Sequence, residues 1–280
     1  MFIWAKLVIE FINSAEFPRM RLKHILTNLQ ANTFNGIQAA EATKRINQLY
    51  GQILYSVFEG LTPQEAEICQ TILGGILCAR EPLSLVTLKD LLIGKGYVED
   101  EEFISATLKR AQSLLIWSKE GDDKQPIYIC HQSLVDFFQH GPEHVKFAVS
   151  GYAKGLGPPD ISSSFCVDLK EQHGHLAYVT LSLLNNKLKF NICNLSSSCL
   201  WNRDVVDLQE WIEINIPSSL AYSGEYWATH LEEASEEKVN LTRDVAKTYF
   251  DKYLLEWFEF LSIKDLIHSL ATTISHMGCP

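Results

Sequence analysis

The sequence predicts a mainly α-helical protein built from a short helical domain, a winged-helix domain with a short β-hairpin, and a non-repeating array of helices. Three observations lead to this fold class. Apolar residues recur at helical spacing along most of the 280 residues. The segment 115–131 instead has the pattern of two short strands around a charged turn, "KEGDDK". No strict repeat period relates the helical segments after residue 168, so the array is expected not to repeat.

Residues 1–60 are expected to form the short helical domain. The segments 2–13 and 18–30 have helical patterns, and Pro18 stands in a first turn, where proline is tolerated. A polar connector leads to a third helix over 43–59, whose apolar residues share one face. The first helix begins at residue 1 without a cap, which is expected of a piece of a longer chain.

Residues 61–138 are expected to form the winged-helix domain. Thr62 and Glu65 make a capping box, with a proline in the first helical position, and predict a helix as far as residue 79. A short helix capped by Ser84 follows, and the acidic start of "VEDEEFISATLKRAQSLL" suits the positive end of a third helix. Three helices, the hairpin and a closing helix, "QSLVDFF", follow the order of a winged helix.

The remaining residues are expected to form a connector and a second helical domain. Residues 139–168 are rich in Gly, Pro and Ser and are interpreted as a linker or irregular loop. Residues 169–280 carry four helical patterns, over 171–193, 218–234, 241–261 and 263–274.

Composition excludes several classes of protein. Lys and Arg total 24 against 34 for Asp and Glu, a net charge of −10, and such an acidic chain repels phosphate backbones. No uninterrupted run of about 18 apolar residues is present, so no membrane span is expected. The seven Cys residues form no CxxC pair and are odd in number, which favours reduced thiols in a cytoplasmic protein without a structural zinc site.

Motifs for catalysis or metal binding are weak. "GYAKGLG" lacks the Ser or Thr and the preceding strand of a Walker phosphate loop. Cys130 and His131 are neighbours on an expected strand, so their side chains face opposite ways and cannot form a catalytic dyad. His173 and His175 lie two residues apart on an expected helix and cannot close one metal site together. We therefore expect no catalytic residues and no metal ligands.

Five segments carry a family resemblance: "FIWA", "REPLSLVTLKDLL", "HQSLVDFF", "LKFNICNL" and "YWATHLEEA". In this order, they resemble the region that follows the ATPase core of fungal NACHT-type proteins, which are signal-transducing NTPases of the NOD-like receptor kind. That region comprises a short helical domain, a winged helix and a second helical domain. The resemblance implies that the Walker A and B motifs lie before residue 1.

The resemblance also implies two nucleotide contacts. In the family, a histidine that opens a motif similar to "HLSFRDFL" reaches the β-phosphate of ADP and latches the inactive state, and His131 matches it. The segment departs from that motif at Gln132, Leu134 and Val135, where the family tends to have Leu, Phe and Arg. Phe2 matches a segment that contributes an adenine-side contact. The implied ligands, ADP or ATP with Mg²⁺, require an ATPase domain that this chain lacks.

Two functions remain open. The first is a non-enzymatic regulatory fragment of a NACHT-type receptor, with an upstream ATPase domain and a downstream repeat domain as partners and oligomerisation only in the full-length protein. The second is an independent winged-helix module that binds DNA or protein. A DNA-reading helix presents Arg, Lys or Asn, whereas "VEDEEF" is acidic, so the first function is favoured and nucleic acid is not an expected partner.

Overall fold

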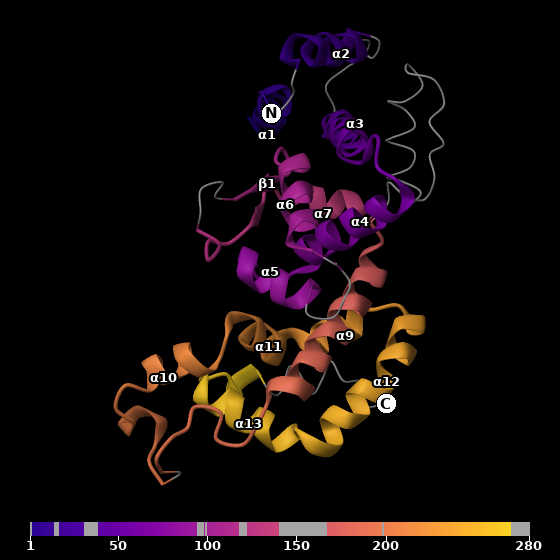
Figure 1. The fold of residues 1–280 in the computed structure, drawn as a ribbon. Coiled ribbons are helices and arrows are strands. Elements are labelled where there is room, and N and C mark those ends of the chain that lie inside the picture. Colours follow the sequence, from indigo (N-terminus) through magenta and orange to yellow (C-terminus); the bar gives the residue numbers. More distant parts are fainter. Residues whose placement is uncertain are drawn as a thin grey trace. The chain divides into compact units, whose positions relative to one another are not determined.

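The structure is a computed structural model that describes residues 2–13, 17–30, 39–93, 98, 100–117, 122–139, 167–197 and 199–269. It is mainly helical, as predicted, and its described strands form a single two-stranded sheet (Figure 1). The chain divides into two compact units. Unit 1 contains residues 1–77 and 98–168, and unit 2 contains residues 78–97 and 169–280. None of the described helices has the length and apolar content that a membrane span requires.

Unit 1 is built around the long helix α3. Its elements are α1 (Phe2–Asn13), α2 (Pro18–Gln30), α3 (Ala39–Phe58), α4 (Pro63–Cys78, in this unit up to Leu77), α6 (Glu101–Arg110), β1 (Leu115–Ile116), β2 (Tyr128–Ile129) and α7 (Ser133–Gln139). The apolar face predicted for α3 is buried, with Tyr50, Ile53 and Leu54 fully inaccessible. Helix α1 packs on α2 and α3, and α3 packs on α6.

Local signals set several helix ends of unit 1. Helix α2 begins at Pro18, and α4 begins after the predicted capping box, in which the Thr62 amide donates to Glu65 Oε2 at 2.7 Å. The C-terminus of α3 is capped by a residue that is distant in the sequence. The Arg110 guanidinium donates to the carbonyl oxygens of Val57 and Glu59, each at 2.6 Å, which satisfies acceptors that the helix itself leaves unpaired.

The predicted hairpin is present but short. Strands β1 and β2 pair antiparallel, with Leu115 opposite Ile129 and Ile116 opposite Tyr128. Cys130 N–H donates to the Leu114 carbonyl at 2.9 Å and extends the pairing by one residue. The residue after Cys130 therefore leaves the hairpin at a defined point.

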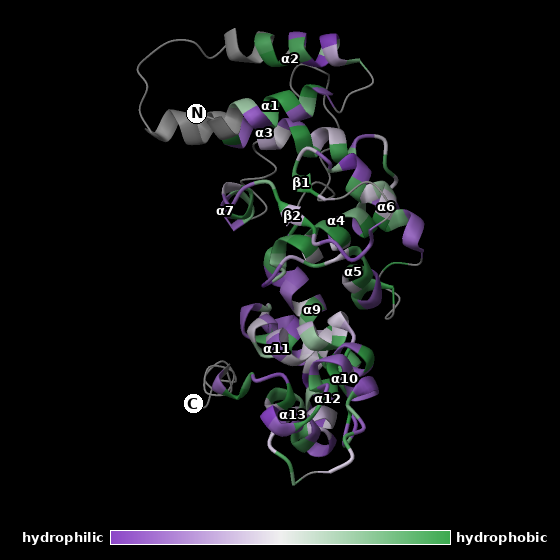
Figure 2. Cartoon of the chain, turned by 90° about the vertical axis from the view of Figure 1, so that its left-hand side faces the viewer, coloured by the Kyte–Doolittle hydropathy of each residue, from purple (hydrophilic) through white to green (hydrophobic). Residues whose placement is uncertain are grey.

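Unit 2 is built around α9. Its elements are α5 (Leu85–Leu92), α9 (Leu169–Lys187), the 3₁₀ turn η2 (Asn202–Asp204), α10 (Leu208–Asn215), α11 (Ser218–Glu233), α12 (Glu236–Lys252), α13 (Leu254–Ile263) and η3 (Ile267–Ser269). Helices α5, α11 and α12 all pack against α9. Figure 2 shows hydrophobic and hydrophilic residues interleaved along α10, α12 and α13, as expected of helices with one buried face.

Three helices predicted for unit 2 differ from those observed. The one predicted over 263–274 is interrupted at Asp265, whose φ is 57°, and only the 3₁₀ turn η3 follows; residues 270–274 lie outside the described residues. The helix predicted over 171–193 ends at Lys187, because the chain turns there through Asn191 and Asn194, whose positive φ values of 49° and 53° are incompatible with a continuing right-handed helix. The single helix predicted over 241–261 is two helices, α12 and α13, which meet at Tyr253 with φ −122° and ψ 7°. The break allows α13 to pack on α11 and α12.

The structure does not test the predicted domain boundaries. The expected boundaries, 1–60, 61–138, 139–168 and 169–280, stay a prediction, and residues 140–166 of the expected linker lie outside the described residues. Helix α5, which the prediction assigns to the winged helix, belongs to unit 2 and packs on α9 and α11.

Substitution of Ser84 tests whether this residue caps the N-terminus of α5. Ser84 Oγ accepts a hydrogen bond from the Thr87 amide at 3.1 Å, so Ser84→Ala leaves an amide of the first turn without that partner. We expect the free energy of unfolding to fall by about 1 kcal/mol in urea denaturation. Ser84→Asn keeps a capping oxygen, so its free energy of unfolding should fall by only a few tenths of a kcal/mol. An equal loss in both variants would contradict the capping role.

Candidate functional site

His131 lies between the hairpin and α7. It follows Cys130, whose amide makes the last hydrogen bond between the two strand segments. One residue, Gln132, separates it from α7. The Leu134 amide donates to the His131 carbonyl at 3.0 Å, so the chain turns into the helix at this residue. Pairing on one side and a helix start on the other hold the imidazole at a defined place in unit 1.

The hydrogen bonds of His131 identify its tautomer. The Ser133 amide donates to His131 Nδ1 at 3.1 Å, so Nδ1 carries no hydrogen. The Ser133 hydroxyl, 2.8 Å from the same nitrogen, must then also donate to it. Its oxygen is left to accept from the Tyr50 hydroxyl at 2.8 Å. In the neutral imidazole, the remaining hydrogen is on Nε2.

Tyr50 anchors this chain of hydrogen bonds in the core. It is fully buried on α3, and its ring lies 5.4 Å from that of Phe137 on α7. Burial raises the pKa of the Tyr50 hydroxyl to about 12. The hydroxyl therefore keeps its hydrogen at neutral pH and remains a donor toward Ser133.

The arrangement presents a hydrogen-bond donor. His131 is half-buried, and within the described residues no hydrogen bond engages its Nε2. An oriented imidazole N–H of this kind can donate to an anionic oxygen, such as that of a phosphate. Of the residues that depart from the family motif, Gln132 is exposed, Leu134 is buried and Val135 is half-buried; Val135 supplies no charge where the family tends to have arginine.

Phe2, the other predicted contact, lies in the first turn of α1. Its side chain is outside the described part of the structure, so its adenine-side role stays a prediction. The structure instead brings His131 together with Tyr50, 81 positions earlier in the chain. No local sequence signal relates these two residues.

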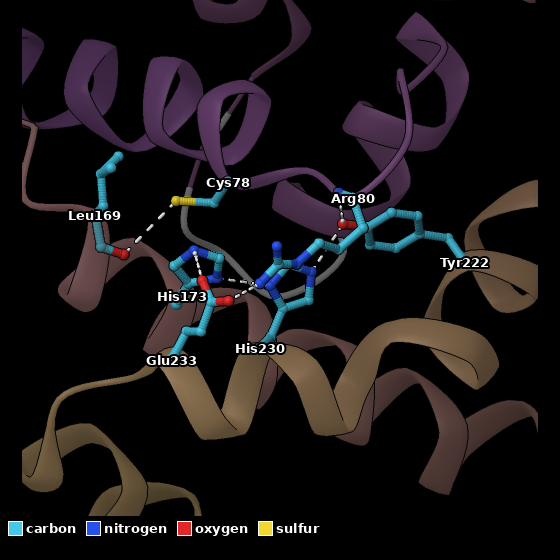
Figure 3. A network of polar contacts seen from close by, with 7 residues as sticks. All are labelled: Cys78, Arg80, Leu169, His173, Tyr222, His230 and Glu233. Atoms are coloured by element: carbon cyan, nitrogen blue, oxygen red, sulfur yellow. Dashed lines mark hydrogen bonds and ion pairs between the residues drawn. The ribbon is translucent and has the colours of Figure 1, made fainter. Parts of the chain in front are cut away.

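His173 and His175, weighed as metal ligands in the sequence, have separate surroundings. His173 is buried, and its Nδ1 lies 2.9 Å from Nδ1 of His230 (Figure 3). His175 Nε2 lies 3.2 Å from Lys238 Nζ. Within the described ranges, no group of three or more His, Cys, Asp or Glu residues could hold a metal ion. The sequence analysis missed the partner His230, which is 57 residues away; it lies in the segment "YWATHLEEA", but no local signal relates it to His173.

Comparison with known proteins reveals one informative similarity. The chain is 24% identical over 273 residues to the vegetative incompatibility protein HET-E-1 of Podospora anserina. The match covers 94% of this chain and 18% of that protein, so the chain spans about a fifth of its relative's length. No family model matches the chain, and no solved structure matches it. At this identity, the similarity supports a distant relation to NACHT-type fungal proteins and nothing finer.

Proposed function

We propose that the chain is a non-catalytic regulatory region of a NACHT-type receptor-like NTPase and that His131 couples nucleotide state to domain arrangement. The observation that carries the proposal is the orientation of His131. Its Nδ1 accepts two hydrogen bonds from Ser133, which leaves Nε2–H as a donor on a half-buried side chain. A donor held in this way fits the role that the resemblance implies, a contact with the β-phosphate of ADP.

The partner that supplies the nucleotide in this proposal is an upstream ATPase domain. ADP or ATP with Mg²⁺ binds there, and the present chain contributes His131, with Phe2 as a further contact on the adenine side. A histidine that contacts ADP and not ATP favours one of two domain arrangements, because only a difference in affinity between states shifts their populations. A downstream repeat domain and assembly of the full-length protein in the cytoplasm complete the proposed setting.

Within this proposal, α4, α6, the hairpin and α7 belong to the winged helix, and α5 takes part in the sequence order only, because it packs in unit 2 on α9 and α11. Their order along the chain supports the assignment. The same elements would serve the alternative function, a stand-alone module that binds DNA or protein. The first turn of α6, with Glu101 and Glu102 after the capping Asp100, disfavours DNA because carboxylates repel phosphates.

His131→Ala tests the proposal in a longer protein in which a NACHT ATPase domain precedes residue 1. Removing a hydrogen bond to a charged group costs about 1.5–3 kcal/mol, so ADP affinity should fall by about 10- to 150-fold. ATP affinity should change far less, since the proposed contact exists only in the ADP state. Isothermal titration calorimetry with each nucleotide measures both values.

His268→Ala provides a matched control, because this exposed histidine lies in η3 of unit 2, outside the proposed contact. It should leave both affinities unchanged. If His131→Ala lowers the melting temperature but leaves the ratio of ADP to ATP affinity intact, His131 is a structural residue and the proposed role is wrong.

A further inference from the structure

Five residues of unit 2 form a closed ring of polar contacts (Figure 3). The Arg80 amide lies 3.2 Å from the Tyr222 hydroxyl, which lies 2.7 Å from His230 Nε2. His230 Nδ1 lies 2.9 Å from His173 Nδ1, and His173 Nε2 lies 3.0 Å from Glu233 Oε2. The Arg80 guanidinium pairs with the other oxygen of Glu233 and closes the ring. The ring therefore joins α9, α11 and the segment that precedes α5.

The hydrogens of this ring can be assigned from its fixed donors. The Arg80 amide can only donate, so the Tyr222 oxygen accepts from it and directs its own hydrogen to His230 Nε2. His230 then carries its hydrogen on Nδ1 and donates to His173 Nδ1. His173 carries its hydrogen on Nε2 and donates to Glu233. In this direction the polar side-chain hydrogens of Tyr222, His230 and His173 all have acceptors, and both imidazoles are neutral.

Added protons disturb this arrangement. A first proton belongs on His173, next to the Glu233 carboxylate, and reverses the two inner bonds: His173 Nδ1–H donates to His230, whose Nε2–H donates to Tyr222. The Tyr222 hydroxyl hydrogen then loses its acceptor in the ring. A second proton places an N–H on each of two nitrogens that are 2.9 Å apart, where there is room for one hydrogen only. The ring is therefore compatible with neutral imidazoles and incompatible with two imidazolium ions.

The surroundings of the ring also favour neutral imidazoles. Burial lowers the pKa of His173, with Glu233 opposing and Arg80 adding to the effect. Burial also lowers the pKa of His230 well below its usual value, and His173 and Arg80 lower it further. The pKa of Tyr222 is raised mainly by burial and also by Cys78 and Glu81.

We propose that this ring is an acid-sensitive switch, which holds the segment around Arg80 against α9 and α11 at neutral pH and releases it in acid. In the open ring, the imidazoles of His173 and His230 bind protons that the closed ring excludes. Both imidazoles have a lower pKa in the closed ring than the 6.5 of a free imidazole, so the closed state is favoured fully above about pH 6.5 and progressively less below it. The ratio of open to closed ring should rise about tenfold per pH unit for each imidazole that gains a proton on opening.

Hydrogen exchange of the 280-residue chain tests the switch without any substitution. The Arg80 amide is protected by Tyr222 in the closed ring, and we expect its protection factor, corrected for the pH dependence of intrinsic exchange, to fall at least about tenfold between pH 6.5 and 5. The Ile93 amide at the end of α5 donates to the Lys89 carbonyl, with no titratable acceptor, and serves as the internal control. Unchanged Arg80 protection over this range would overturn the proposal.

Nitrogen NMR of the imidazoles supplies a second readout. At pH 7.5, we expect His230 as the Nδ1–H tautomer and His173 as the Nε2–H tautomer, and neither should titrate near pH 6.5. Tyr222→Phe removes the ring's central hydroxyl and should weaken protection of the Arg80 amide already at pH 7.5, while His175→Gln, on the same helix as His173, should not. Ordinary titration of both ring histidines near pH 6.5 would show that the switch does not exist.

Discussion

Replacing Trp257 with alanine is expected to lower the free energy of unfolding of unit 2 by about 3–5 kcal/mol. Trp257 is 1% exposed, and its ring meets those of Trp227 and Tyr249 edge-on at centroid distances of 5.9 and 6.2 Å. Its Nε1–H also donates to the Gly224 carbonyl at 2.8 Å in the buried core. The substitution removes apolar contacts from this core, leaves a cavity and deprives the carbonyl of that donor, and these losses act together.

Urea denaturation followed by far-ultraviolet circular dichroism measures this loss. Leu255→Ala is the matched control, because Leu255 lies in the same helix and is 76% exposed; it should change the free energy by less than about 0.5 kcal/mol. Trp257→Phe retains most of the ring volume and should fall between the two. Similar losses for Trp257→Ala and Leu255→Ala would refute the assignment of Trp257 to the core.

Replacing Gly224 with valine is expected to cost about 3 kcal/mol, near the upper end for overpacking. A Cβ atom at this position of α11 would lie 2.3 Å from Cε1 and 2.6 Å from Cζ of Phe260, closer than any real Cβ contact. Phe260 is fully buried in α13, so its ring cannot move aside into solvent. The absence of a side chain at Gly224 is thus what allows α11 and α13 to approach this closely.

A double-mutant cycle tests this contact. In a Phe260→Leu background, the ring is gone, and Gly224→Val should cost clearly less than in the original chain. Gly60→Ala in unit 1 is a contrasting case, because a Cβ there meets nothing within 4 Å and the expected cost of about 1 kcal/mol comes from its φ of +77° alone. Strictly additive costs for Gly224→Val and Phe260→Leu would contradict the proposed clash.

The place of His131 between two elements could be predicted from the sequence, because the hairpin before it and the helix after it both follow from local patterns. Its role as a nucleotide contact comes from the family resemblance and stays a prediction. The orientation of its imidazole could not be predicted, since it depends on Ser133 and, through it, on Tyr50 in α3. Which nitrogen carries the hydrogen could be deduced only when these atoms were seen together.

The sequence by itself determined the mainly helical fold, the start of α2 at Pro18, the capping box before α4 and the buried face of α3. Each of these rests on interactions among residues within a few positions of one another, so a pattern in the chain records them directly.

Only the tertiary structure decided the grouping of α5 with α9 and α11, the break at Tyr253 and the ring that joins Arg80 to His173 and His230. The grouping of α5 and the ring join residues up to about 150 positions apart, as between Arg80 and Glu233. They depend on which helix faces pack together and on the free energy of burying those faces. The periodicity of apolar residues shows that a helix face is buried, but it does not show which other helix covers that face.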